Sequence, residues 1–155
     1  MFKEYKEIAP SGWAYEQPLS FEFEIKDSSK VYELILDVEH ADIFGFENAY
    51  VKVFTEFPNG TKTEQQLSLE LATKNGIWNG KCSAGVCDVM ISLQQSVVFA
   101  QTGKYKVTFE QYGRNPVLKG ISKLGLLIEN TDRTKKSSND QLKKKSTQPM
   151  PIKKF

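Results

Sequence analysis

The two cysteines of this 155-residue chain lie close together, in the stretch Lys-Cys-Ser-Ala-Gly-Val-Cys-Asp. Cys82 and Cys87 are separated by four residues, one of which is glycine. Two cysteines are too few for a structural zinc site unless histidines lie nearby. Unpaired thiols suit a reducing cytosol, whereas a local disulfide suits an exported protein. The spacing leaves both states open, and a disulfide is expected if the protein is exported.

His40 is the only histidine and the first candidate for acid–base chemistry. General-base catalysis needs a partner and a cleft, and spacing shows neither, so we expect a partly exposed residue at a strand end. Asp37, Glu39, Asp42 and Glu47 offer the oxygen ligands that Ca²⁺ prefers, but they lack the spacing of a calcium loop. We interpret them as a solvated acidic edge. The chain also lacks the common nucleophile, phosphate-loop and zinc-protease motifs, so no catalytic, metal-binding or cofactor-binding residue is predicted.

Aromatic residues outside the clearest strands are the candidates for a binding platform. The set comprises Trp13, Phe44, Phe46, Trp78 and Tyr112. β-Sandwiches often bind sugars through aromatic rings on one face or in loops, although most rings in such a domain belong to the core. We expect binding in the loops 41–48 and 72–87, with Phe44, Phe46 and Trp78 as the possible binding surface.

The elements that must position these residues are β-strands. Residues 50–71 predict two strands joined at Phe57-Pro58-Asn59-Gly60, because Asn-Gly between strand-like runs is the strongest short hairpin signal. Proline cannot donate the N–H of a paired strand residue. Pro58 at the second position and Gly60 after Asn59 therefore favour a type I turn followed by a G1 bulge.

Alternation of apolar and polar residues predicts further strands. They cover residues 19–25, 31–40, 88–98, 105–112 and 121–129. Leucine spacing in the last segment would also suit a short helix, but Gly125 in its middle favours a strand. About eight short strands and no convincing helix indicate an all-β protein, an antiparallel β-sandwich of jelly-roll or immunoglobulin-like type.

Composition divides the chain into three parts. Residues 1–17 show no sustained period and are interpreted as an extended lead-in or tether, and residues 18–130 as the sandwich. Residues 131–155 are rich in lysine and serine and poor in apolar residues, so we expect a disordered tail. This tail carries a net charge of +6, against −4 for residues 1–130. Lysine clusters can contact nucleic acid, anionic lipid or acidic partners, but without interleaved aromatics no nucleic-acid binding is predicted.

Six fragments, in order and with similar spacing, resemble the GldH family, lipoproteins associated with gliding motility in the Bacteroidetes. The fragments are FKEYKEIAPSGW from residue 2, PLSFEFEI at 18–25, FPNG at 57–60, NGIWNG at 75–80, TGKYKVTFEQ at 102–111 and GISKLGLLIE at 120–129. The resemblance covers roughly residues 2–130. The basic tail and the cysteine pair are not part of the family pattern.

The resemblance implies a signal peptide and a lipidated cysteine upstream of the lead-in, and hence a lipid anchor that holds the protein at the periplasmic face of a membrane in the cell envelope. It implies a non-enzymatic accessory role in gliding or its linked secretion system, through binding of other envelope proteins, and it transfers no catalytic residues. The alternative is a glycan-binding module of similar shape that stacks sugars on Trp78 or on Phe44 and Phe46.

Overall fold

The computed structural model describes residues 2–134, and within them the chain forms eleven β-strands and no helix. The strands are β1 (Phe2–Glu7), β2 (Trp13–Ala14), β3 (Leu19–Ile25), β4 (Lys30–Ala41), β5 (Asn48–Glu56), β6 (Lys62–Glu70), β7 (Lys81–Ser83), β8 (Val86–Val97), β9 (Gly103–Gln111), β10 (Val117–Leu118) and β11 (Ile121–Thr134).

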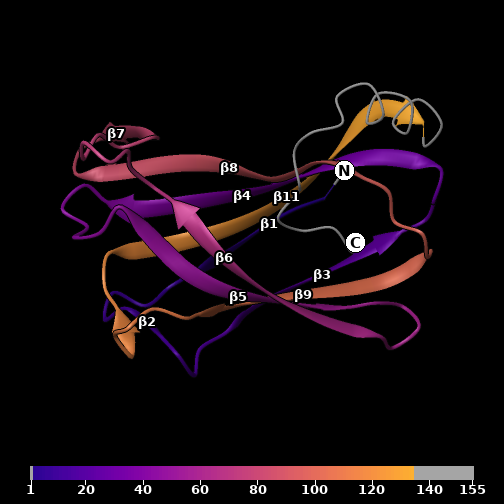
Figure 1. The fold of residues 1–155 in the computed structure, drawn as a ribbon, viewed down its shortest axis with the longest axis horizontal. Helices are drawn as coiled ribbons and strands as arrows, with labels where there is room; N and C mark the ends of the chain where they lie inside the picture. The colour runs from indigo at the N-terminus through magenta and orange to yellow at the C-terminus, as the bar shows by residue number, and fades with distance from the viewer. Residues whose placement is uncertain (1, 135–155) are drawn as a thin grey trace.

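Two antiparallel sheets make up the sandwich (Figure 1). One has the strand order β1-β11-β4-β8-β7 and the other β3-β9-β5-β6, and a two-stranded ribbon of β2 and β10 lies at one end. Only β5–β6 and β7–β8 pair as neighbours in sequence, while β3–β4, β4–β5 and β8–β9 cross between the sheets as in a jelly roll. The predicted fold class is thereby confirmed, with more strands than expected because β1 and the short β2, β7 and β10 carry no periodic signal.

The core lies between the two sheets, where the alternating residues of each strand meet. In β3, Phe21, Phe23 and Ile25 are buried while the intervening glutamates are exposed. In β4, Leu34 and Leu36 are fully buried on the same principle. Period-two alternation places one face of each strand inward, so the strand predictions for 19–25 and 31–40 identify core residues correctly.

The turn between β5 and β6 has the predicted geometry. Gly60 has a φ of +90° and donates its N–H to the Phe57 carbonyl at 2.9 Å, which closes a type I turn. The Phe57 N–H then bonds to the Thr61 carbonyl at 2.8 Å across the bulge. The Asn59 side chain accepts from the Thr61 N–H at 2.9 Å, so the turn residues satisfy their own backbone.

Both ends of the described chain belong to the sheet, which differs from the predicted boundaries. Residues 2–7, expected in the lead-in, form β1 and pair with β11 from Phe2–Ile128 to Glu7–Lys123. At the other end β11 continues through Thr134, which pairs with Lys30 of β4. The first residues assigned to the tail are therefore strand, and the rest of that prediction concerns residues 135–155, outside the described part.

Candidate functional site

His40 lies in the interior, and the expectation of a partly exposed histidine is wrong. It is the penultimate residue of β4, paired with Cys87 of β8 and Ile121 of β11, and it has 0% exposure. Its Nδ1 donates to the carbonyl of Ala41 at 2.8 Å, which orients the ring. A central position between two paired strands buries it, because β4 continues one residue past it with β8 and β11 on both sides.

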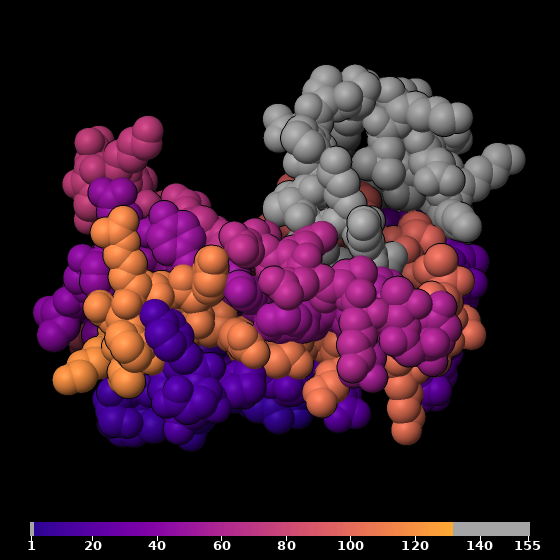
Figure 2. Space-filling view, turned by 60° about the horizontal axis from the view of Figure 1, so that its bottom comes forward, coloured from indigo at the N-terminus to yellow at the C-terminus, as the bar shows by residue number. Residues whose placement is uncertain are grey.

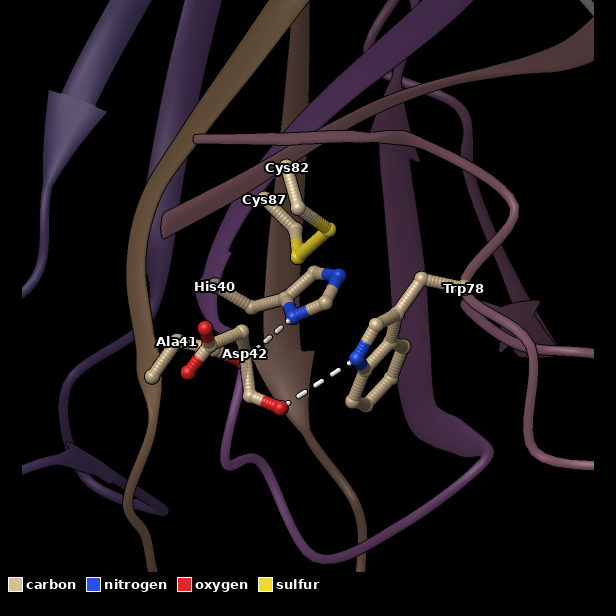
Figure 3. The surroundings of a disulfide bond; sticks show 6 residues. All are labelled: His40, Ala41, Asp42, Trp78, Cys82 and Cys87. Carbon is tan, nitrogen blue, oxygen red and sulfur yellow. Dashed lines mark hydrogen bonds between the residues drawn. A yellow bond between two sulfur atoms is a disulfide. The ribbon is translucent and has the colours of Figure 1, made fainter. Parts of the chain in front are cut away.

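The His40 ring lies between the disulfide of Cys82 and Cys87 and the indole of Trp78 (Figure 3). The ring centroids of His40 and Trp78 are 4.5 Å apart. The indole N–H of Trp78 donates to the carbonyl of Asp42 at 3.2 Å. Trp78 is thus half-buried and its polar group is already used, so its main role in the structure is to cover one end of the core.

The disulfide closes the short hairpin of β7 and β8. Cys82 and Cys87 face each other in the register, with Ser83 and Val86 paired beyond them. The turn residues Ala84 and Gly85 both have positive φ, 53° and 84°, as a two-residue hairpin loop requires. At the tip of this hairpin the Gly85 carbonyl accepts the N–H of Asp42 at 2.9 Å. This bond ties the hairpin to the 41–48 loop.

Phe44, Phe46 and Trp78 lie together, but only Phe46 is well exposed. Phe44 is 6% exposed, and its ring contacts Phe46 at 5.6 Å and Trp78 at 6.4 Å between centroids. Gly120 makes room for it, since a Cβ there would lie 2.7 Å from the Phe44 ring. Of the two phenylalanines predicted as binding surface in this loop, Phe44 is buried and anchors the loop, while Phe46 projects with 49% exposure.

A groove runs along this end of the sandwich between the 41–50 segment and the 113–120 loop. Figure 2 shows the two segments side by side, purple and orange, at the left end of the molecule. The groove has two lobes of about 410 and 510 Å³ that share Phe46, Asn115 and Leu118. Its apolar lining includes exposed Ile43, Phe46, Tyr50 and Val117, together with buried Leu118.

Gln111, a buried residue at the end of β9, holds the 113–120 loop in place. Its Nε2 donates to the carbonyls of Asn115, at 2.8 Å, and Trp13, at 3.3 Å. Its Oε1 accepts the N–H of Gly113. The loop is bound a second time through Tyr15, whose hydroxyl donates to the Gly113 carbonyl. The groove wall is therefore a bonded structure rather than a free loop.

The charged residues that line the groove are both basic. Arg114 lies in one lobe and Lys119 in the other, and both are exposed. Neither forms an ion pair with a side chain of residues 2–131. No carboxylate is among the lining residues described, although the folded part of the chain is acidic overall. The groove thus combines apolar surface with two unpaired positive charges.

The remaining two aromatic candidates lie near the groove with different roles. Trp13 is 1% exposed and donates its indole N–H to the Gln17 carbonyl at 2.9 Å, so it is a core residue. Tyr112 is exposed beside the groove, with the ammonium of Lys52 4.5 Å from its ring centroid. Its N–H bonds to the Tyr50 carbonyl at 2.8 Å, which joins the loop to β5.

The acidic residues of β4 do not form a solvated edge throughout. Asp37 is 5% exposed because the Tyr5 hydroxyl donates to its Oδ2 at 2.6 Å and covers it. That bond, together with burial, raises the pKa of Tyr5 to about 12. Hydrogen bonding to Asp37, burial and the charges of Asp37 and Glu39 raise the pKa of Asp88 to about 6. Across residues 2–134, no grouping of three or more histidine, cysteine or acidic residues is arranged to hold a metal ion.

Comparison with known proteins gives the family. The family model of the GldH lipoprotein matches residues 1–128, which is most of the chain. The chain belongs to the GldH lipoprotein family. It is 27% identical over 139 residues to the gliding motility lipoprotein GldH homolog of Christiangramia forsetii, with 85% of each chain covered. It is 28% identical to the gliding motility lipoprotein GldH of Flavobacterium johnsoniae, covering 85% of this chain and 86% of that protein.

Among solved structures, a family 35 carbohydrate-binding module from Clostridium thermocellum is similar at a TM-score of 0.40 and 13% identity, over 79% of this chain and 77% of the module. That likeness is too slight to support an argument about ligands. For this GldH family member, no helix in the part of the chain that the structure describes is long and apolar enough to cross a membrane.

The 41–48 loop, where binding is expected, forms one wall of the groove and includes Ile43 and Phe46. The other wall, with Arg114, Val117 and Lys119, lies in a loop for which no binding was predicted. The signal available was the apolar Val117 next to two cations in a loop, which alternation along a single strand does not reveal. Bonds between distant parts of the chain hold that loop against the 41–50 segment, from the Ala41 N–H to the Gly120 carbonyl at 2.7 Å and from the Tyr112 N–H to the Tyr50 carbonyl at 2.8 Å.

Proposed function

We propose that this protein is a non-enzymatic lipoprotein of the cell envelope that assists gliding motility, or its linked secretion system, by binding other envelope proteins through the groove. The observation that carries this proposal is the gathering of exposed apolar side chains around one groove in a GldH family member. Contiguous exposed apolar surface is typical of protein-binding sites. The names of both relatives support the motility role.

The position of the groove suits a protein tethered at its N-terminal side. Phe2 pairs with Ile128, which pairs with Leu34, whereas the groove begins at Ala41. Leu34 and Ala41 are seven residues apart in β4, which corresponds to about 23 Å along the strand at the usual strand rise. Figure 1 shows the N-terminus toward the right and the ribbon of β2 at the opposite end. A lipid attached upstream of β1 would therefore leave the groove pointing away from the membrane.

The arrangement of titratable groups supports a binding role rather than catalysis. His40 is enclosed by Trp78 and the disulfide, so a substrate has no path to its ring. Asp37 is covered by Tyr5 and lies on the sheet, away from the groove. A general acid or base has to reach the reacting proton directly or through one water. The groove itself contributes no histidine, cysteine or carboxylate to its lining.

The glycan-binding alternative has weaker support from the same geometry. Phe44 is buried and the Trp78 indole N–H is bonded to Asp42, so two of the three rings expected to stack sugars are engaged in the fold. Sugar sites also need several convergent polar groups, and the Asn48 amide is already bonded to Ser68.

A test in the source organism uses a deletion of the gene and complementation with the full protein. The groove variant Ile43→Asp/Val117→Asp should fail to restore colony spreading, or delivery of secreted surface proteins in a non-spreading cell, while accumulating at normal levels. A matched variant on the exposed faces of β6 and β8, Gln66→Asp/Gln95→Asp, should complement fully. Full complementation by the groove variant would contradict the proposal.

A further inference from the structure

The groove fits one kind of occupant better than others. We infer that it binds an extended, acidic segment of a partner protein that carries at least two aromatic or aliphatic anchors. This inference rests on the proposed function, since it names the partner chemistry of the same surface. It depends on two independent features of the groove, its two-lobed apolar lining and the sign of its charges.

The two lobes set the number of anchors. One lobe lies between Ile43 and Val117, and the other between Tyr50 and Gly113, with the Phe46 ring shared by both. Each has a volume in the range of pockets that enclose a large side chain or a small ligand, about 300–1,000 Å³. A single side chain fills one lobe only, so a segment that covers Phe46 and enters both lobes buries the most apolar surface.

The charges of the groove determine the net charge that the bound segment should carry. Lys119 accompanies the first lobe and Arg114 the second, so positive charge is available along the whole groove. Arg114 presents a planar fork suited to carboxylates. Asp42 and Glu47, the acids of the facing loop, are not part of the lining. A basic groove on an acidic domain attracts negative segments and disfavours a second copy of the same domain.

Other occupants fit less well. The Lys-rich residues 135–155 have the same sign of charge as Arg114 and Lys119, so by charge they are a poor match for the groove. A neutral glycan would leave both cations without partners and would find no carboxylate in the lining with which to hydrogen-bond its hydroxyls. An acidic peptide satisfies the charges and fills the lobes at the same time.

The test is selection of random 12-residue peptides displayed on phage against the full 155-residue chain, followed by fluorescence anisotropy of the enriched peptides. Enriched sequences should combine aspartate or glutamate with two spaced aromatic or aliphatic residues. Arg114→Glu/Lys119→Glu should weaken their binding by at least about tenfold, because two favourable charge pairs become repulsive. Raising the salt concentration should weaken binding to the wild type as well. The charge-matched control Lys26→Glu/Lys104→Glu, at the far end of β3 and β9, should change it less than twofold.

The apolar half of the inference has its own variant. Ile43→Ser/Val117→Ser changes only exposed side chains and should abolish binding of the same peptides, with unchanged thermal unfolding showing that the fold is intact. Enriched peptides that depend on Ile43 and Val117 but carry no net negative charge would overturn the acidic segment and leave protein binding by the groove in place. Enrichment of no groove-dependent peptide would overturn the inference. Binding of glycans from an array, lost in the same variant, would overturn both the inference and the proposed function.

Discussion

Gln111 is the residue whose replacement should most directly disconnect the groove wall from the sandwich. It is 3% exposed and bonds to three backbone groups, the carbonyls of Trp13 and Asn115 and the N–H of Gly113. Gln111→Leu keeps a similar volume and removes all three bonds. The Gly113 N–H could satisfy at most one of the two carbonyls, so at least one acceptor loses its partner.

The loss of stability in Gln111→Leu depends on which polar groups remain buried without a partner. A buried polar group left without a partner costs about 1–3 kcal/mol. Gly113 and Asn115 lie in a loop that water reaches, so each of their unpartnered groups should cost an amount at the lower end of this range. The Trp13 carbonyl lies deeper and should cost more. We expect a loss of about 3 kcal/mol in the free energy of unfolding. For a domain of this size, that corresponds to a fall in melting temperature of about 10 °C.

Urea unfolding followed by tryptophan fluorescence measures this change. The matched control is Gln66→Leu on the exposed face of β6, which should remain within about 0.5 kcal/mol of the wild type. A Gln111→Leu protein as stable as that control would mean that the three bonds make no net contribution to stability. Peptide binding to the groove should weaken in Gln111→Leu even under conditions where the protein remains folded.

Three further predictions concern the disulfide and the outer face of the β1-β11-β4-β8 sheet. Reducing Cys82–Cys87 should lower stability by about 2 kcal/mol, the loop-closure value for so short a loop; an unchanged urea midpoint would argue against that value. The pKa of Asp88, about 6 against an ordinary 3.8, means that its contribution to stability is fully present below pH 3.8 and lost as the pH rises through 6. Asp88→Asn should therefore be more stable than the wild type at neutral pH, by less than about 1 kcal/mol because solvent screens an exposed group, and this advantage should disappear in acid; equal pH dependence of the two proteins would contradict it. Gly125→Ala would place a Cβ 2.4 Å from the Tyr5 ring and displace it, so spectrophotometric titration should show the Tyr5 pKa falling from about 12 toward 10; a pKa unchanged at about 12 would mean that the ring keeps its place.

Local chemistry in the sequence was enough to predict the hairpin and the main core strands. The turn at 57–60 depends on residues adjacent in sequence, since Pro58 excludes one turn type and Gly60 supplies the positive φ. Strand β4 is similar, because alternation alone separates Leu34 and Leu36 from the outer face. These features do not require knowledge of which strands pair.

Features that depend on long-range pairing were beyond this reasoning. His40 was expected to be partly exposed because it ends a predicted strand, yet β8 and β11 flank it and Trp78 covers it. Residues 2–7 place two aromatic residues three positions apart among charged ones, a spacing that predicts no strand, and β1 forms because β11 offers an open edge. The groove has the same origin, since its walls are some 70 residues apart in the chain.

The end of the sandwich that carries the groove thus separates into a buried support and an exposed surface, with Phe44 at the boundary. On its inner side Phe44 contacts Trp78 and His40, and the His40 ring lies beside the disulfide. On its outer side it contacts Phe46, the ring shared by both lobes. Changes to the buried members should alter stability and, through Phe44, the shape of the groove, whereas changes to the exposed residues should alter binding alone. Because the support is closed by a covalent bond, we expect the groove to keep its shape without a ligand, so that binding costs this protein less ordering entropy than a flexible loop would lose.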